Sequence, residues 1–250
     1  MDGRMPHRRP LAALDLNATV GGPAGTAHER GMRLLLIDHG CCDPPHTRIH
    51  RLREGLQALG CTVAVCGPSS VPGLEEQPRG MHGIHLHDVA AASREFLAAV
   101  RDGSPDAFLA AVSRVPSRLL GLARETARQM IAEAADDVFP DAIFVLHAGI
   151  LTDLAVETGA PVVVHVSPED LAAAAARPSL KRLVTAAIGS SDRVIAADEA
   201  AAATLVEWLG SDPDTRSRSD VWTFDDAATA RVAEACRLAL ARRRGEPGLE

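Results

Sequence analysis

Polar side chains follow three apolar runs of the sequence, and their types suit acid–base chemistry and ligand binding. Histidine exchanges a proton near neutral pH, and a carboxylate can orient a hydroxyl group or accept its proton. His147 and Asp170 are therefore the candidate catalytic residues, with Asp170 as a base or as the group that orients a substrate hydroxyl. The candidates for substrate binding are His39, Gly40, His46, Thr47, Arg48, Gly149, Ser167 and Glu169.

The first of these groups lies in the loop that follows the apolar run 33–37. Ligands of an open parallel sheet bind outside the carboxyl ends of the strands, so this loop is expected to face a cleft. Thr47 can cap the helix that follows, and Arg48 in its first turn can hold an anionic group of a substrate. Arg48 is equally well explained as a solvated side chain, and both interpretations remain open.

The candidates after the later runs also have structural explanations. Asp170 stands where a helix-capping residue would stand, and capping explains it at least as well as catalysis. His147 is equally well explained as a hydrogen-bonded histidine of the core or of a loop. His165, near the end of the run 161–166, is expected to point into the core.

The spacing of cysteines, histidines and serines gives little support to metal or serine-hydrolase chemistry. The adjacent Cys41 and Cys42 lack the usual spacing of zinc ligands. His85 and His87 fall on one face of an expected strand, but no third ligand is evident. No G-x-S-x-G nucleophile elbow is present in the sequence. We therefore expect no metal site and no covalently bound cofactor.

Composition indicates a globular chain without a nucleic-acid surface or a membrane span. The net charge is −7 and the pI is about 5.8, whereas sequence-independent nucleic-acid binding needs clustered basic charge. No apolar run approaches the roughly 20 residues that a membrane span requires. The five cysteines are an odd number without a disulfide spacing. They predict reduced thiols and a cytoplasmic location.

Apolar runs and helical patterns alternate from Met32 onwards. Strands that alternate with helices predict a parallel sheet with right-handed crossovers. The fold class is therefore α/β, a single Rossmann-like, doubly wound parallel sheet with helices on both faces. The expected strands are 33–37, 61–66, 81–86, 142–146, 161–166 and 193–197.

Helical patterns occupy the intervals between these strands. Residues 89–137 form a long alanine-rich stretch with breaks near 103–105 and 115–116, and 210–220 is a polar loop. The remaining expected helices are 49–59, 150–158, 180–188, 198–209 and 227–244. The expected organisation is a flexible leader over 1–31, the α/β domain over 32–222, and a C-terminal helix and tail over 223–250.

Four segments carry a family resemblance when they are taken in order. The opening unit contains MRLLLIDHG and RIHRLREGLQALGCTVAVCG, and PDAIFVLHAGILTDLAVETGAPVVVHVSPEDL forms the middle of the chain. SSDRVIAADEAAAATL is the most specific segment, and SDVWTFDDAATARVAEA follows it as a linker. Together they resemble the N-terminal, acceptor-side domain of retaining GT-B glycosyltransferases of the glycogen-synthase-like and mycothiol-synthase-like group.

The resemblance implies that this chain is the acceptor-binding half of a sugar transferase and that its sheet is one half of a GT-B fold. The family's second domain binds a nucleotide-sugar donor with a glycine-rich loop and basic residues, and the sequence has no comparable loop-to-helix segment. The chain is expected to take a small-molecule acceptor. Its expected partner is a donor-binding subunit or a second copy of the chain. A nucleotide-sugar donor is expected only where a donor-binding partner is present.

The sequence also departs from the family pattern. Leu146 and Ser167 stand where the family has histidines, and Pro44-Pro45 replaces the usual Gly-Gly. These departures keep open a non-catalytic auxiliary or scaffolding protein that binds and activates a partner enzyme. They also keep open an unrelated enzyme on the same sheet. The last helix is expected to cover the face that a second domain would meet, or to dock that domain.

Overall fold

The computed structural model describes residues 31–40, 48–70, 79–210, 218–225 and 227–246. Residues 1–30 of the expected leader 1–31 lie outside the described residues, and so do the predicted site residues His46 and Thr47. The strands are β1 (Arg33–Ile37), β2 (Thr62–Pro68), β3 (Met81–Ile84), β4 (Ala142–Val145), β5 (Val162–Val166), β6 (Arg193–Ala196) and β7 (Ser219–Val221).

The helices lie in the intervals between the strands and after the last of them. They are α1 (Arg48–Ala58), α2 (His87–Ala90), α3 (Arg94–Asp102), α4 (Pro105–Arg114), α5 (Ser117–Val138), α6 (Thr152–Glu157), α7 (Pro168–Ala175), α8 (Pro178–Ser190), α9 (Glu199–Leu209) and α11 (Ala228–Arg244). Among the described residues, no helix combines the length and the apolar character needed to cross a membrane.

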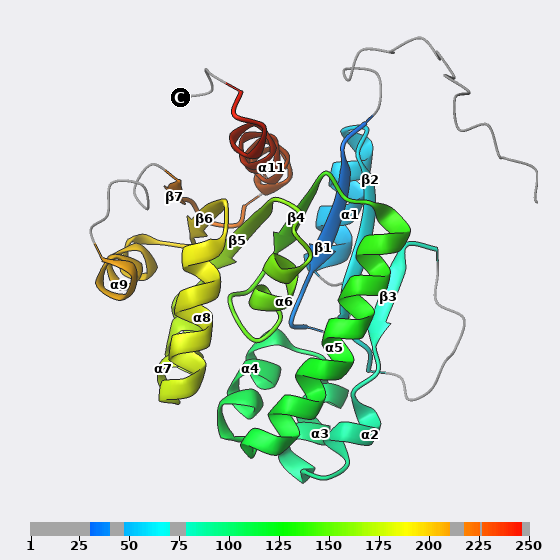
Figure 1. Ribbon diagram of the computed structural model, residues 1–250, viewed down its shortest axis with the longest axis vertical. Helices are drawn as coiled ribbons and strands as arrows, with labels where there is room; N and C mark the ends of the chain where they lie inside the picture. The colour runs from blue at the N-terminus through cyan, green and yellow to red at the C-terminus, as the bar shows by residue number, and fades with distance from the viewer. Residues whose placement is uncertain (1–30, 41–47, 71–78, 211–217, 226, 247–250) are drawn as a thin grey trace, which may run out of the picture. The chain divides into compact units, whose positions relative to one another are not determined.

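All the described strands form one sheet in the order β3-β2-β1-β4-β5-β6-β7, and every neighbouring pair is parallel. The first six positions of this order are those of a Rossmann-like sheet, and the chain changes direction across the sheet between β1 and β4. Figure 1 shows the strands running downwards, with α2, α3 and α4 below their carboxyl ends. The predicted α/β fold class is confirmed.

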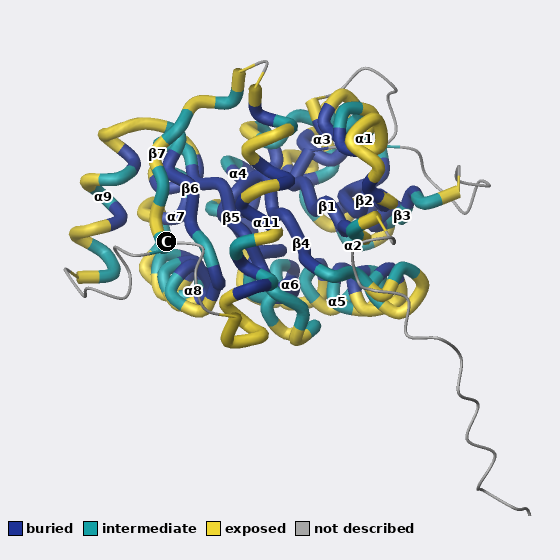
Figure 2. Tube along the Cα trace, turned by 90° about the horizontal axis from the view of Figure 1, so that it is seen from above, coloured by how far each residue is buried: buried dark blue, intermediate teal, exposed yellow. Residues whose placement is uncertain are grey.

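Helices cover both faces of this sheet, which explains why its strands are continuous apolar runs. Leu35 and Ile37 of β1 pack into the core beneath α3 to α9, whereas Leu34 and Leu36 pack beneath α1 and α11. All four side chains have no exposed surface. Figure 2 shows the buried strands in dark blue, flanked by helices whose outer sides are exposed.

The long helical stretch breaks where the sequence predicts. Ser104 accepts a hydrogen bond from the Ala107 N–H and caps α4, and Gly103 ends α3 in the left-handed region with φ 75°. A glycine adopts that conformation without the steric cost that a Cβ would bring. The turn between α3 and α4 is therefore sharp, and it brings the start of α4 over the carboxyl end of β1.

Three features differ from the sequence-based expectation. Residues 219–221 form β7, although the sequence predicts a polar loop there, and residues 168–175 form α7, which the sequence reading does not include. β3 ends at Ile84 and His87 begins α2, so His85 and His87 do not share one face of a strand. β7 pairs with β6 on one side only, and two of its three residues are exposed.

The C-terminal helix α11 packs against the chain's own sheet. It contacts β4, β5 and α1, and Val232, Ala233 and Cys236 are buried in the core beneath it. The small side chains of this helix allow it to approach the sheet closely. The described part of α11 therefore covers the α1 side of the sheet, at its centre.

Candidate active site

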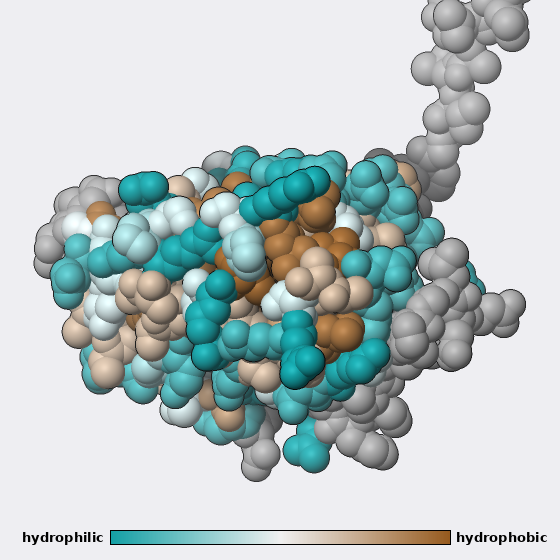
Figure 3. Space-filling model, turned by 90° about the horizontal axis from the view of Figure 1, so that it is seen from below, coloured by the Kyte–Doolittle hydropathy of each residue, from teal (hydrophilic) through white to brown (hydrophobic). Residues whose placement is uncertain are grey.

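A cavity of about 380 Å³ opens at the carboxyl ends of β1, β4 and β5, where the sheet changes direction. Open α/β sheets bind ligands at this position. The face seen from below carries mostly hydrophilic groups around one apolar patch (Figure 3). The described residues that line the cavity are Asp38, Gly40, Arg48, Gly103, Pro105, Asp106, His147, Ser167 and Glu169.

Asp170 is fully buried and both caps a helix and holds a histidine. The Ser167 side chain accepts from the Asp170 N–H, and Asp170 Oδ2 accepts from the Ser167 N–H at 2.9 Å, which together form a capping box. Oδ2 also accepts from the Ala148 N–H at 3.1 Å, and Oδ1 lies 3.1 Å from His147 Nδ1. The capping role is confirmed, and the same carboxylate reaches the histidine of the neighbouring strand.

His147 is held with one ring nitrogen toward Asp170 and lines the cavity. Because Asp170 is the acceptor for backbone N–H groups, His147 Nδ1 donates to it, and Nε2 keeps a lone pair when the ring is neutral. Burial alone lowers the pKa of His147, but the hydrogen bond to Asp170 and the charges of Asp170 and Asp38 together raise its pKa above the ordinary value. His147 is therefore a stronger base than a free histidine.

Asp38 is a site residue that the sequence analysis did not single out. It directly follows β1, is 4% exposed, and accepts from the Gly40 N–H at 2.9 Å. Its Oδ1 lies 3.9 Å from His147 Nε2. Asp38 could have been found from the sequence, because it is a carboxylate directly after a buried strand at the position where the sheet changes direction. For Gly103, Pro105 and Asp106 the sequence predicts only a helix break, but the turn that they form lines one side of the cavity.

His39 does not line the cavity and instead holds two loops together. It is fully buried, and its Nε2 accepts from the Leu151 N–H at 3.1 Å. Burial, and then the nearby charge of His147, lower the pKa of His39 to about 3. A Cβ added to Gly149 would lie 2.5 Å from His39 Nε2. Glycine at 149 therefore allows the loops after β1 and β4 to join.

The remaining predicted residues lie on or beside the cavity. A Cβ added to Gly40 would lie 2.9 Å from the Pro105 ring, so glycine lets this loop meet the α3–α4 turn. Arg48 begins α1, and its guanidinium lies 3.8 Å from the centre of the Phe224 ring. Burial lowers the pKa of Arg48, and the charges of Asp38 and Asp170 act in the opposite direction. Ser167 and Glu169 lie on the wall.

His165 points into the structure, as the sequence predicts, and is 2% exposed. Its Nδ1 donates to the Leu146 carbonyl oxygen at 3.1 Å. Burial lowers the pKa of His165 to about 4, so the ring is neutral at physiological pH. Across the described residues, no group of three or more His, Cys, Asp or Glu side chains is arranged to hold a metal ion.

Comparisons with known proteins find similarity among solved structures alone, since no protein-family model and no curated protein matches the sequence. The Escherichia coli trehalose-6-phosphate structure bound with UDP-2-fluoro glucose is 15% identical, with a TM-score of 0.47 over 75% of this chain and 48% of that chain. A Streptomyces glycosyltransferase is 15% identical, with a TM-score of 0.37 over 66% of this chain and 50% of that one.

The UDP-GlcNAc 2-epimerase of Neisseria meningitidis, bound to UDP-GlcNAc, is 13% identical. Its TM-score is 0.40, over 87% of this chain and 53% of the epimerase chain. The chain thus spans about half the length of each of these structures. Because every identity is 15% or less and every TM-score is below 0.5, we draw no conclusion about activity from these likenesses.

Proposed function

We propose that this chain supplies the acceptor-binding half of a GT-B sugar transferase, and that a donor-binding subunit supplies the nucleotide sugar. The main support is the pair formed by His147 and Asp170. Asp170 fixes the Nδ1 side of the ring at 3.1 Å, and His147 lines the cavity at the switch point of the sheet. A histidine oriented by a buried carboxylate is a common arrangement for general-base catalysis.

The proposed reaction gives each group a defined task. An acceptor hydroxyl donates its proton to His147 Nε2 as its oxygen bonds to the anomeric carbon of the donor sugar. The bond from that carbon to the nucleoside diphosphate breaks, and the diphosphate leaves with the electron pair. Asp170 acts through His147 as a positioning residue, because it holds the ring and stabilises the imidazolium that forms.

The charges on the cavity wall favour a polyhydroxylated acceptor. Asp38, Asp106 and Glu169 offer carboxylate oxygens, which accept hydrogen bonds from hydroxyl groups. Arg48 supplies a guanidinium on the described part of the wall and suits an anionic substituent. The alternative is a non-catalytic auxiliary protein. Such a protein would not need a histidine held toward the cavity.

The test uses the full chain together with the products of neighbouring genes. The complex is incubated with labelled nucleotide sugars and a panel of neutral and phosphorylated sugars, and transfer is measured. We expect His147→Gln to lower transfer by about 10²–10⁴-fold, the usual contribution of a general base. His82→Gln is the matched control, since His82 also lies near a carboxylate, 3.8 Å from Asp137, but does not line the cavity.

The outcomes separate catalysis from an auxiliary role. Transfer that depends on His147 and not on His82 supports the proposal. Equal stimulation of a partner enzyme by wild type and His147→Gln would favour the auxiliary function. Failure to observe transfer with any neighbouring product would count against a split enzyme.

A further inference from the structure

An aromatic cluster lies beside the cavity on the α1 side of the sheet. Trp222 and Phe224 lie two positions apart in the segment that follows β7, and their ring centres are 5.9 Å apart. The His165 ring lies 6.2 Å from Trp222 and 5.5 Å from Phe224. The Trp222 N–H donates to the Ala196 carbonyl oxygen, which fixes the start of this segment at the end of β6.

These two aromatic side chains are only partly buried, as are Phe139 and Trp208 elsewhere in the described structure, but they lie beside the cavity. The sequence holds only two tryptophans and five phenylalanines. Phe96, Phe108 and Phe144 are at most 1% exposed and serve the core. Trp222 and Phe224 are half-buried at the edge where ligands of this fold bind. Partly exposed aromatic rings beside a cavity are common in ligand sites.

His165 supplies an independent observation. Its Nδ1–H donates to the Leu146 carbonyl oxygen, so Nε2 is an acceptor. Nε2 is buried and has no hydrogen-bond partner. Buried polar atoms are normally paired. A buried ring nitrogen without a hydrogen-bond partner also occurs in His39, His82, His85 and His87. Among the described residues, however, only the His165 ring packs against the half-buried Trp222 and Phe224. Its Nε2 is therefore an acceptor that a ligand donor could use.

Two guanidinium groups flank the cluster and connect it to the cavity. Arg231 lies 5.7 Å from the centre of the Trp222 ring, and Arg48 lies 3.8 Å from the centre of the Phe224 ring. Arg48 also lines the cavity. Arg48 therefore lies between the cavity and the Phe224 ring, and its side chain connects the two. Flat guanidinium groups stack on aromatic faces, which favours a planar, electron-rich substituent.

We propose that Trp222, Phe224 and His165 form a second subsite that binds an aromatic ring of the acceptor. A hydroxyl or N–H donor on that ring bonds to His165 Nε2. This inference deepens the proposed function, because it names the acceptor as an aryl-substituted, phenol-like compound. It rests on the proposed function, since only a transferase has an acceptor. Because His165 Nε2 is buried and its ring packs against Trp222 and Phe224, the proposal requires the Trp222 side chain to move when the ligand donor bonds to Nε2.

The test follows Trp222 fluorescence in the full chain. The background variant Trp208→Phe leaves Trp222 as the sole tryptophan. Four probes are titrated: methyl, cyclohexyl, phenyl and 4-hydroxyphenyl β-glucosides. We expect the phenyl glucoside to bind about threefold to tenfold tighter than the cyclohexyl glucoside, because contact between aromatic rings contributes binding energy beyond that of the buried area. A further gain of about threefold to tenfold is expected for the 4-hydroxyl group.

The variant His165→Asn isolates the buried acceptor. The asparagine amide can replace the Nδ1–H donor to Leu146 but has no group at the position of Nε2. We expect the variant to lose the gain from the 4-hydroxyl group and to keep the preference for phenyl over cyclohexyl. Equal affinities for phenyl and cyclohexyl, or a 4-hydroxyl gain that survives His165→Asn, would overturn the inference.

Free phenol separates this inference from the proposed function. If methyl glucoside binds and the aryl group adds nothing, the acceptor cavity stands and the aromatic subsite is wrong. If phenol changes Trp222 emission in a saturable way while methyl glucoside does not bind, the subsite stands and the sugar-acceptor function is wrong. If neither probe binds, both are wrong.

Discussion

At both the amino and the carboxyl edge of the sheet, an aspartate accepts a backbone hydrogen bond and pairs with a basic side chain. The basic partner differs between the two edges. At the amino edge, Asp141 accepts from the Arg33 N–H at 2.8 Å and pairs with the Arg33 guanidinium. Asp192 at the same edge accepts from the Val162 N–H at 2.9 Å and pairs with Arg243. At the carboxyl edge, Asp170 accepts from two backbone N–H groups and pairs with a histidine.

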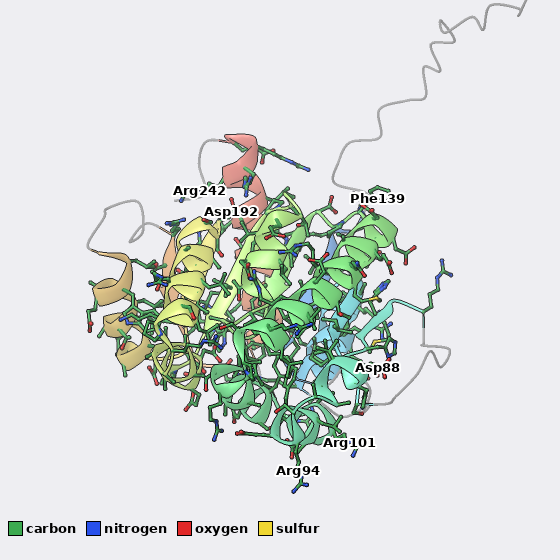
Figure 4. The ribbon with its side chains drawn as sticks, turned by 60° about the horizontal axis from the view of Figure 1, so that its bottom comes forward. Asp88, Arg94, Arg101, Phe139, Asp192 and Arg242 are labelled. Carbon is green, nitrogen blue, oxygen red and sulfur yellow. The ribbon has the colours of Figure 1, made fainter. Side chains whose placement is uncertain are left out.

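The difference lies in the third partner. Arginine keeps its charge throughout the physiological range, so the pairs at the amino edge only fasten strands and helices. Histidine gains and loses a proton in that range, so the Asp170 pair can take part in chemistry. Figure 4 shows the two ends of the molecule, with Asp192 and Arg242 at one and Asp88, Arg94 and Arg101 at the other. The comparison indicates that the identity of the partner distinguishes a pair that only fastens two elements from a pair that can also exchange a proton.

The largest expected effect comes from removing the aspartates one at a time. Asp170→Ala leaves the buried Ala148 N–H, the partly buried Ser167 N–H and His147 without their acceptor. We expect a loss of about 3–5 kcal/mol in the free energy of unfolding. Asp192→Ala removes one backbone hydrogen bond and a half-exposed ion pair, and about 1–2 kcal/mol is expected. Urea unfolding of both variants measures the difference, and equal losses would contradict the distinction between the edges.

The second prediction concerns acid. The pKa of His39 is lowered to about 3 and that of His165 to about 4, from 6.5. Below pH 6.5 the unfolded chain binds these protons first, so stability falls as the pH falls toward these pKa values. Each histidine is expected to remove about 2 kcal/mol between pH 7.5 and pH 5. Urea unfolding at the two pH values tests this, and His165→Asn should remove about half of the combined loss.

His147 is expected to change the pH dependence of stability in the opposite direction. Its pKa is raised, so its protonated form stabilises the fold. This stability is fully present below the ordinary histidine pKa and is lost as the pH rises through the raised value. His147→Gln is therefore expected to make the loss in acid larger. A smaller acid loss in this variant would show that the carboxylates around His147 do not stabilise its charge.

A smaller effect is expected where the two loops meet. Gly149→Ala places a methyl group 2.5 Å from His39 Nε2 and 2.7 Å from a Leu109 methyl carbon. We expect a loss of about 1–3 kcal/mol, the range for overpacking a core. Thermal unfolding with a crystal structure of the variant would show whether His39 leaves the Leu151 N–H. An unchanged midpoint would mean that the loops yield without cost.

The smallest expected effect is a gain. Gly121 lies inside α5, and a Cβ there would meet nothing within 4 Å. Gly121→Ala should stabilise the protein by about 0.5–1 kcal/mol, because alanine favours the helix. The variant is also the matched control for Gly149→Ala, since the same substitution is made away from the cavity. A loss of stability at 121 would indicate that the outer side of α5 has an undetected partner.

Much of the fold could be predicted because the central strands are buried on both faces. Such strands are continuous apolar runs, and β1, β4, β5 and β6 all follow this pattern. β7 could not be found in this way, since its sequence Ser219–Val221 is short, polar and half-exposed. An edge strand is defined by the neighbour it pairs with and not by burial.

The site could be predicted in part. His147 and Asp170 were candidates as single residues, because each follows a strand near its carboxyl end. Their mutual bond depends on β4 and β5 lying side by side, and Asp38 joins them only because β1 lies next to β4. His39 was predicted to bind substrate, but it fastens two loops, and the sequence carries no sign of its buried environment.

The Asp192–Arg243 pair has a practical consequence. It fastens the end of α11 to the start of β6, on the edge of the sheet opposite the cavity. A surface attachment placed after α11 would therefore leave the cavity facing the solution. An immobilised protein could be screened with small molecules by surface plasmon resonance in that orientation, without the support blocking access to His147.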